Sequence, residues 1–310
     1  MRSFLKNHNS FLIVSHKNPD GDAFGSEIAV GLGLKKMKKE FKIVASDAVP
    51  KRFRHFELKD MVKREVGDFK YDAIIVLDSA DKYRLGPIVE QIDFSKSLAN
   101  IDHHISNAYF GTLNIVKPNL SSTCEIVYEI IKDIINIDKD IATYLYLGIL
   151  TDTGSFRYAN TNANSLRSAS ELLTYGVDAS LVSERVWFRD SLNRIKLLGD
   201  VLETLVVEDG FSLMWVNQDM MKKRGANEED TEEFVNYGLT LDGVRVAAIL
   251  KERAGRELKI SLRSKKGTDV NLIAKEYGGG GHQNAAGFTV KNKTITEFMP
   301  ELKKKIKGLI

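Results

Sequence analysis

Short apolar runs alternate with patterns of helical periodicity in the first half of the chain. Five runs favour strands, and they span Phe11–Val14, Phe41–Ala45, Ala73–Leu77, Leu98–Ile101 and Leu113–Val116. Two of the helical patterns span Ser122–Ile135 and Ile141–Leu150. Strands that are apolar throughout and alternate with helices are typical of a parallel sheet covered on both faces. The pattern therefore predicts an α/β fold with a doubly wound parallel sheet in the N-terminal part.

The second half of the chain has a mixed pattern. Strands are predicted at Ser212–Val216, Val244–Lys251, Leu258–Arg263 and Phe288–Val290, and helices at Asp230–Gly238 and Asp269–Tyr277. The C-terminal residues 207–310 are therefore expected to form a smaller mixed α/β domain. Residues 191–206, with Ile195, Leu198 and Leu202 at helical spacing, predict a helix that connects the two domains. The same spacing also fits an ordinary core helix.

Composition and charge are those of a soluble globular protein of two-domain size. Of the 310 residues, 43% are hydrophobic and 28% are charged, which are ordinary values. The single cysteine, Cys124, excludes an internal disulfide and indicates a reducing compartment. No apolar run approaches bilayer length, and the run before His16 is too short for a signal peptide, so we expect a cytoplasmic protein without membrane segments. A net charge of +3 fits a small anionic substrate better than the coating of long nucleic acid.

The loop after the first predicted strand carries the first candidate chemistry. Between that strand and a helical pattern lie His16, Asp20 and Asp22, and Pro19 and Gly21 supply the turn. Turn and helix-cap chemistry alone explains Pro19, Asp20 and Gly21, but it needs neither His16 nor Asp22. Imidazole with carboxylates is a ligand set that suits Mn²⁺ or Mg²⁺. The loop is therefore a candidate metal site, at the strand end where open α/β sheets bind their ligands.

Three other elements also end in ionisable residues. Asp78 follows Ala73–Leu77, the sequence Asp102-His103-His104 follows Leu98–Ile101, and Asp152 follows Ile141–Leu150. An aspartate at such a position often only caps a helix, whereas two adjacent histidines after a buried strand are uncommon. Carboxylates gathered at one sheet edge would repel one another and raise each other's pKa values. Two divalent cations would neutralise four of them: Asp20, Asp22, Asp78 and Asp152.

Together these motifs resemble the DHH phosphoesterase superfamily. The resemblance rests on His16-x-x-x-Asp20-x-Asp22, on Asp78 and Asp152 after their elements, and on Asp102-His103-His104, all in the order of the family. It implies a DHH catalytic domain at residues 1–190 and hydrolysis of phosphoesters.

The glycine-rich stretch Gly278–Phe288 resembles the signature of the DHH-associated C-terminal domain. Consecutive glycines let backbone N–H groups approach an anion, and His282 can donate to a phosphate. A linker or helix cap would account for the glycines, but not for the His-x-x-Ala-Ala-Gly-Phe that follows. The resemblance implies a substrate-binding domain at residues 207–310, in which Gly280, Gly281 and His282 contact a terminal phosphate.

The resemblance further implies a two-metal site. One ion would be held by His16, Asp20 and Asp78. The other would be held by Asp22, Asp78, His103 and Asp152. Asp78 would bridge the two ions, and a water between them would attack the phosphate. The ligand types favour Mn²⁺, with Mg²⁺ and Co²⁺ as alternatives.

Two members of the DHH motif have other implied roles. His104 is expected to contact the substrate or donate a proton, and it is not expected to be a ligand. Asp102 is expected to orient a ligand histidine from behind. With Asp78 they form the predicted catalytic set.

The chain is similar in length and domain content to the nano-RNase group of this superfamily. The resemblance implies an exonuclease that hydrolyses RNA of about two to five nucleotides to mononucleotides, and 3′-phosphoadenosine 5′-phosphate (pAp) to AMP. It also implies a homodimer. Arg263 is a candidate phosphate ligand, or else a solvated charge at a strand end. Arg157 is a candidate substrate contact beside Phe156, although that loop fits a partly buried anchor as well.

Other functions share some of these motifs. A manganese-dependent inorganic pyrophosphatase would share the N-terminal motifs, and Arg263–Lys266 faintly resembles its basic cluster, but the Gly278–Gly287 signature is not expected there. A hydrolase of linear or cyclic dinucleotides is a further alternative. A non-catalytic nucleotide-binding protein would be expected to lack a ligand, and none is lacking. The sequence does not rank these substrates or set the polarity of attack.

Overall fold

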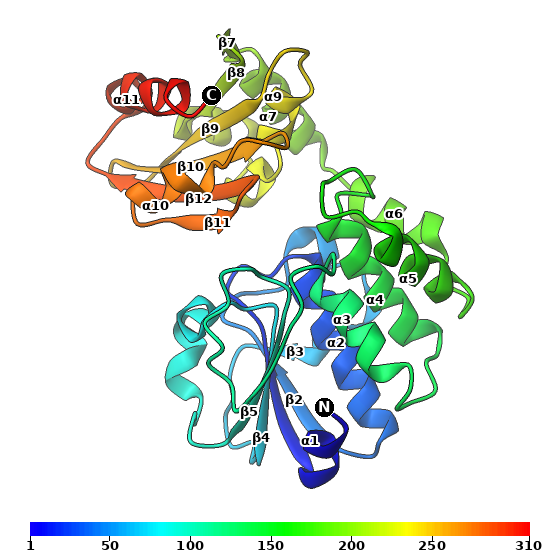
Figure 1. The fold of residues 1–310 in the computed structure, drawn as a ribbon. Coiled ribbons are helices and arrows are strands. Elements are labelled where there is room, and N and C mark those ends of the chain that lie inside the picture. The colour runs from blue at the N-terminus through cyan, green and yellow to red at the C-terminus, as the bar shows by residue number, and fades with distance from the viewer. The chain divides into compact units, whose positions relative to one another are not determined.

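The computed structural model describes all residues from Met1 to Ile310. Contacts between Cα atoms divide the chain into two compact units, Met1–Arg189 and Asp190–Ile310. Each unit contains one six-stranded sheet with helices (Figure 1). The predicted order of a parallel-sheet domain followed by a smaller mixed α/β domain is confirmed. No helix has both the length and the apolar character needed to cross a membrane.

The first unit is built on a parallel sheet of strand order β3-β2-β1-β4-β5-β6. Its strands are β1 (Ser10–Val14), β2 (Glu40–Val44), β3 (Val62–Lys63), β4 (Ala73–Leu77), β5 (Ser97–Asp102) and β6 (Leu113–Val116). The chain runs from β1 outward to β3, and then returns to place β4 on the other side of β1. Strand order therefore reverses between β1 and β4, which is the point where open α/β sheets bind ligands.

Helical elements cover both faces of this sheet. The α-helices are α1 (Arg2–Asn7), α2 (Gly21–Lys36), α3 (Thr123–Ile131), α4 (Lys139–Asp152), α5 (Ala163–Leu173) and α6 (Ala179–Trp187). The short 3₁₀ elements are η1 (Lys51–Phe53), η2 (Glu57–Met61) and η3 (Lys82–Gln91). One core joins α2, α3 and α4 to the sheet, and a second core on the opposite face includes Leu85 and Ile88 of η3. Burial on both faces explains why the strands are apolar throughout.

The second unit has a sheet of order β11-β12-β10-β9-β8-β7, in which only β8 and β9 are parallel. Its strands are β7 (Val206–Glu208), β8 (Phe211–Val216), β9 (Val246–Arg253), β10 (Glu257–Ser264), β11 (Gly280–His282) and β12 (Ala285–Lys291). Strand β11 was not predicted, because glycine disfavours strands. Pairing with β12 at the sheet edge nevertheless gives this segment strand geometry.

Two helical layers pack on the second sheet. One core contains residues of α10 (Asn271–Glu276) and α11 (Ile295–Lys307). The core of the opposite face contains residues of α7 (Leu192–Leu202), α8 (Gln218–Arg224) and α9 (Val235–Leu239), and η4 (Glu228–Thr231) precedes α9. The segment predicted as a connecting helix corresponds to α7. Leu197, Leu198 and Val201 of α7 pack within the second unit.

Candidate active site

The polar residues that follow the strands of the first unit converge at its sheet switch point. They lie on the loop after β1, after β4, at the end of β5 and in the last turn of α4. The structure brings together all of the predicted ligands and both additional members of the predicted catalytic set: His16, Asp20, Asp22, Asp78, Asp102, His103, His104 and Asp152. Adjacent parallel strands place their carboxyl ends on the same edge, so the strand order accounts for this convergence.

The predicted ligands form two groups with the spacing of metal ligands, and Asp78, Asp102 and His104 form a further group. In the first group, one atom each from His16, Asp20 and Asp78 lie within 4.8 Å of one another. In the second group, atoms of Asp22, His103 and Asp152 do the same.

Asp78 connects the two groups. Its Oδ2 lies 3.4 Å from Nε2 of His16, and its Oδ1 lies 3.6 Å from Nε2 of His103. One oxygen thus faces each histidine, as a carboxylate shared by two cations would require.

Backbone contacts orient these ligands. The ring of His16 meets the carbonyl of Lys17 through Nδ1 at 2.8 Å, so that Nε2 faces Asp78. A histidine that ligates a metal usually donates its other ring N–H in this way. Oδ1 of Asp20 accepts from the N–H groups of Asp22 and Ala23, both at 3.0 Å. Asp20 therefore caps α2 with one oxygen and has the other oxygen available for a metal ion, so the two interpretations of this residue are compatible.

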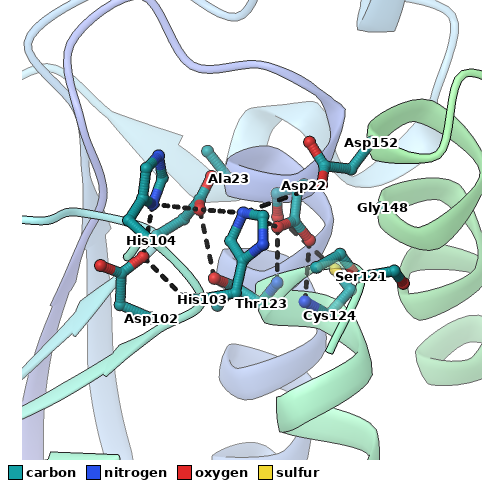
Figure 2. Close-up of polar contacts among 12 residues, drawn as sticks. Asp22, Ala23, Asp102, His103, His104, Ser121, Thr123, Cys124, Gly148 and Asp152 are labelled. Atoms are coloured by element: carbon teal, nitrogen blue, oxygen red, sulfur yellow. Dashed lines mark hydrogen bonds and ion pairs between the residues drawn. The ribbon is translucent and has the colours of Figure 1, made fainter. Parts of the chain in front are cut away.

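Asp22 is held from behind by the start of α3. Its two oxygens accept from the backbone N–H groups of Thr123 (2.6 Å) and Cys124 (2.7 Å), as Figure 2 shows. A Cβ atom at Gly148 of α4 would lie 2.2 Å from Sγ of Cys124 and 2.8 Å from Oδ1 of Asp22. Only glycine therefore lets α4 come close enough to complete the site.

The charges and pKa values of these side chains show whether the arrangement fits divalent cations. Burial, together with the charges of neighbouring aspartates, raises the pKa values of Asp22 and Asp152. Burial opposes protonation of His16, but the hydrogen bond to Asp78 and the charges of Asp20 and Asp78 raise the pKa of His16 to about 10. The site thus has excess negative charge, which a divalent cation would relieve. Burial lowers the pKa of His103, which favours the neutral imidazole that ligates metals. The residues therefore fit divalent metal ions.

Asp102 is buried and contacts the ring of His104, and its carboxylate lies within 4.8 Å of both Asp78 and His104. Nδ1 of His104 is 2.6 Å from Oδ1 of Asp102, which also accepts from the backbone N–H of His103 at 2.9 Å. The aspartate was predicted to orient a ligand histidine, whereas its side-chain contact is with the ring of His104. Nε2 is then the ring nitrogen of His104 that does not contact Asp102.

Three polar residues that support the site were missed by the sequence analysis. Asn107 donates to Oδ2 of Asp102 (2.6 Å) and to Oδ1 of Asn100 (2.8 Å). Thr123 donates to Oδ1 of Asp78 (3.1 Å), and Asn160 donates to Oδ2 of Asp152 (3.1 Å). Isolated Asn and Thr residues have no spacing that marks them. Asn107 lies three residues after His104, and Thr123 lies at the N-terminus of α3. Only these two positions hinted at a role.

Arg157 lies on the exposed turn after α4. Its Nε donates to the carbonyl of Gly154 (2.7 Å), in the segment that follows Asp152. Phe156 is partly buried and packs against the core, as the anchored-loop alternative expected. Arg157 therefore stays a candidate substrate contact.

The predicted phosphate contacts of the second unit share one face of its sheet. His282 of β11 is opposite Ala285 of β12, which in turn is opposite Arg263 of β10. Residues directly opposite each other in an antiparallel pair present side chains on the same face. Gly280 lies two residues from His282 and therefore on the same face.

Gly279, which precedes β11, and the two glycines of β11 are not all required by packing. A Cβ atom at Gly279 would lie 2.3 Å from the carbonyl oxygen of Gly287, and one at Gly281 would lie 2.2 Å from that of Ala285. A Cβ atom at Gly280 would meet nothing within 4 Å. Packing therefore demands glycine at 279 and 281, whereas at 280 it leaves bare backbone that an anion could approach.

Comparisons with known proteins agree with this division of the chain. Residues 10–149 match the DHH family, N-terminal domain, and residues 213–310 match the DHHA1 domain. The chain is 37% identical to the bifunctional oligoribonuclease and PAP phosphatase NrnA of Thermus thermophilus, over 92% of this chain and 85% of that protein. It is 30% identical to the probable bifunctional oligoribonuclease and PAP phosphatase NrnA of Streptococcus mutans, over 91% of this chain and 90% of that protein. The crystal structure of an exopolyphosphatase-related protein from Bacteroides fragilis matches with a TM-score of 0.93 and 28% identity, over 99% of this chain and 94% of that one.

Proposed function

Because the chain belongs to the DHH family of metal-dependent phosphoesterases, we propose that it hydrolyses short oligoribonucleotides to mononucleotides and pAp to AMP. The observation that carries the proposal is the convergence of six candidate ligands from four segments, with one oxygen of Asp78 toward each histidine. Relatives that match nearly the whole chain bear the names of these activities. A homodimer in the cytoplasm is part of the proposal.

The two groups of ligands would hold two divalent ions. His16, Asp20 and Asp78 would hold one, and Asp22, His103 and Asp152 would hold the other together with Asp78. Oxygen and imidazole ligands favour Mn²⁺ over softer ions. When bound, such ions supply a water of lowered pKa and stabilise negative charge on phosphate oxygens.

His104 acts from beside the metal ligands. Burial opposes its protonation, but the hydrogen bond to Asp102 and the charge of Asp78 raise the pKa of His104. The N–H group at Nδ1 of His104 keeps its hydrogen bond to Asp102. Nε2 is therefore the atom that donates to a phosphate oxygen or to the leaving group. In the second unit, the backbone of Gly280 and Gly281 and the side chains of His282 and Arg263 bind a terminal phosphate.

A substrate panel with Mn²⁺ tests this function. RNA of two to ten nucleotides, pAp, pyrophosphate and cyclic di-AMP would each be supplied to the purified full chain. We expect the rate to be highest for dinucleotides and trinucleotides, to fall with length, and to be near zero for pyrophosphate. Rates that do not fall with length, or pyrophosphate as the preferred substrate, would refute the proposal.

Replacing Gly280 by alanine should weaken substrate binding without harming the fold. The open space around this position predicts a change in unfolding free energy within about 0.5 kcal/mol. The added methyl group would displace an anion from the backbone, so we expect KM for a 5′-phosphorylated dinucleotide to rise about tenfold. Gly279→Ala is the matched control, because its Cβ would clash with backbone and should lower the melting temperature. An unchanged KM in Gly280→Ala would remove this residue from the phosphate site.

Replacing Asn107 by leucine should lower kcat by about 10- to 100-fold, the range found when a group that supports an active-site ligand is lost. The change leaves Oδ2 of Asp102 without its donor, so His104 is no longer held in one position. Asn114→Leu is the control, since Asn114 bonds the backbone of Gly111 elsewhere in the unit. We expect the control to lose stability but to keep its kcat, and equal losses of kcat in both variants would contradict a positioning role for Asn107.

A further inference from the structure

The face of the second sheet that bears Gly280 and His282 also carries a row of cations. Along β10, residues 257, 259, 261 and 263 are partly exposed and alternate with buried ones. Lys259 is opposite Lys251 of β9 on one side and Thr289 of β12 on the other. Since alternate residues of a strand share a face, Lys251 and Lys259 lie on the same face as Arg263. We call Lys251, Lys259, Arg263 and His282 the cationic face.

Lys251 is the unusual member of the cationic face. It is only 5% exposed, and no hydrogen bond or ion pair engages its ammonium group. The nearby carboxylate of Glu228 is already shared by Arg253 and Lys259, at 2.5 Å and 3.0 Å. Burial, followed by the charge of Lys259, lowers the pKa of Lys251 to about 8, although Glu232 and Glu228 oppose this shift. The ammonium group therefore lacks a dedicated counter-ion.

Lys251 lies between the core of this face and the place where η4 reaches the sheet, since Glu228 of η4 bonds both Lys259 and Arg253. Its neighbours along β9 on the same face, Ala247 and Ile249, belong to the core beneath α7, α8 and α9. Its neighbour across the ladder, Lys259, lies on the partly exposed strand β10. Burying an unpaired charge is costly, and an apolar side chain of similar size would avoid that cost. A lysine at this position is thus explained if an anion from outside the chain completes the pairing.

We propose that Lys251, together with Lys259, forms an anion subsite that binds a second phosphate group of a short oligonucleotide. It lies four residues along β10 from the Arg263 end of the cationic face, which corresponds to roughly 14 Å at about 3.4 Å per residue. The phosphates of an RNA follow one another along its backbone. A chain bound through its terminal phosphate at Arg263 and His282 therefore presents a further phosphate along the same face. This inference rests on the proposed function and extends it to the choice of substrate length.

The test uses the full-length, Mn²⁺-loaded protein and three substrates that differ in phosphate number: ApA, pApA and pApApA. ApA has only the phosphate to be cleaved, pApA adds a terminal phosphate, and pApApA adds one more for the subsite. In Lys251→Met we expect KM for pApApA to rise about tenfold, as for the loss of one charge-assisted hydrogen bond. KM for ApA should stay within about twofold. We expect kcat to be unchanged, because the lost interaction stabilises the bound substrate and the transition state equally.

Two further variants separate binding from folding. Lys251→Arg keeps the charge and should recover most of the affinity for pApApA. Lys275→Met removes an exposed lysine of α10, on the opposite layer of the sheet, and should change neither constant. Melting temperatures show whether Lys251→Met folds, and we expect no decrease, since an unpaired buried charge is lost.

The results distinguish failure of the inference from failure of the proposed function. Unchanged KM for pApApA in Lys251→Met, or an equal rise for ApA, would overturn the subsite while leaving the nuclease activity intact. A wild-type protein that hydrolyses none of the three RNAs would instead overturn the proposed function and the subsite with it.

Discussion

Replacing Asp78 by asparagine is expected to lower turnover of a dinucleotide by at least about 10³-fold, because the change removes the one carboxylate that faces both groups of ligands. Asparagine is the most informative replacement. Asp78 has a φ of 53°, a left-handed conformation that asparagine tolerates and alanine does not. The backbone therefore stays unstrained, and the loss can be assigned to the ligand. Bound Mn²⁺, measured by mass spectrometry, should fall below two ions per chain.

Asp81→Asn is the matched control for Asp78→Asn. Asp81 lies three residues further on and caps η3 through the N–H groups of Tyr83 and Arg84, a role that asparagine can also fill. We expect this control to keep both its turnover and its metal content. Full activity with two bound ions in Asp78→Asn would rule out a shared carboxylate.

Replacing His103 and replacing His104 should have different effects on kcat and on metal content. His104→Gln is expected to lower kcat by about 10²- to 10⁴-fold, the range for loss of a general acid, and to keep two bound Mn²⁺ ions. His103→Gln is expected to lose metal as well as activity, because Nε2 of His103 faces Asp22, Asp78 and Asp152. The measurements are kcat, KM and metal content for each variant.

His55→Gln is the control for the histidine pair. His55 is exposed, distant in the sequence and outside both ligand groups, so its loss should change nothing. If His104→Gln lost as much metal as His103→Gln, His104 would be a ligand, and its role as a proton donor would be wrong.

The parts of the fold that follow from strong local patterns were predicted closely. Strand β4 occupies Ala73–Leu77 as expected, because burial on both faces requires an unbroken apolar run. Helix α5 was not predicted, since its buried positions include Ser165 and Ser168 beside Ala169 and Leu172. Buried serines weaken the apolar periodicity on which such a prediction depends.

Some residues of the candidate site could likewise be predicted from the sequence, and others could not. Histidines and aspartates that follow strands can be found from spacing, because the edge of a parallel sheet brings them together. Asn107 and Lys251 could not be found in this way. Their roles depend on which neighbours already have partners, and tertiary packing decides that. Likewise, the difference between Gly279 and Gly280 depends on how closely the backbone of β12 approaches.

We propose that this chain assembles one pair of divalent cations at the switch point of its first sheet. The most direct measurement is a crystal structure of the protein grown with Mn²⁺, with anomalous diffraction data. We expect two anomalous peaks, one among His16, Asp20 and Asp78, and one among Asp22, His103, Asp152 and Asp78. A single peak outside these groups, or no peak at saturating Mn²⁺, would contradict this proposal.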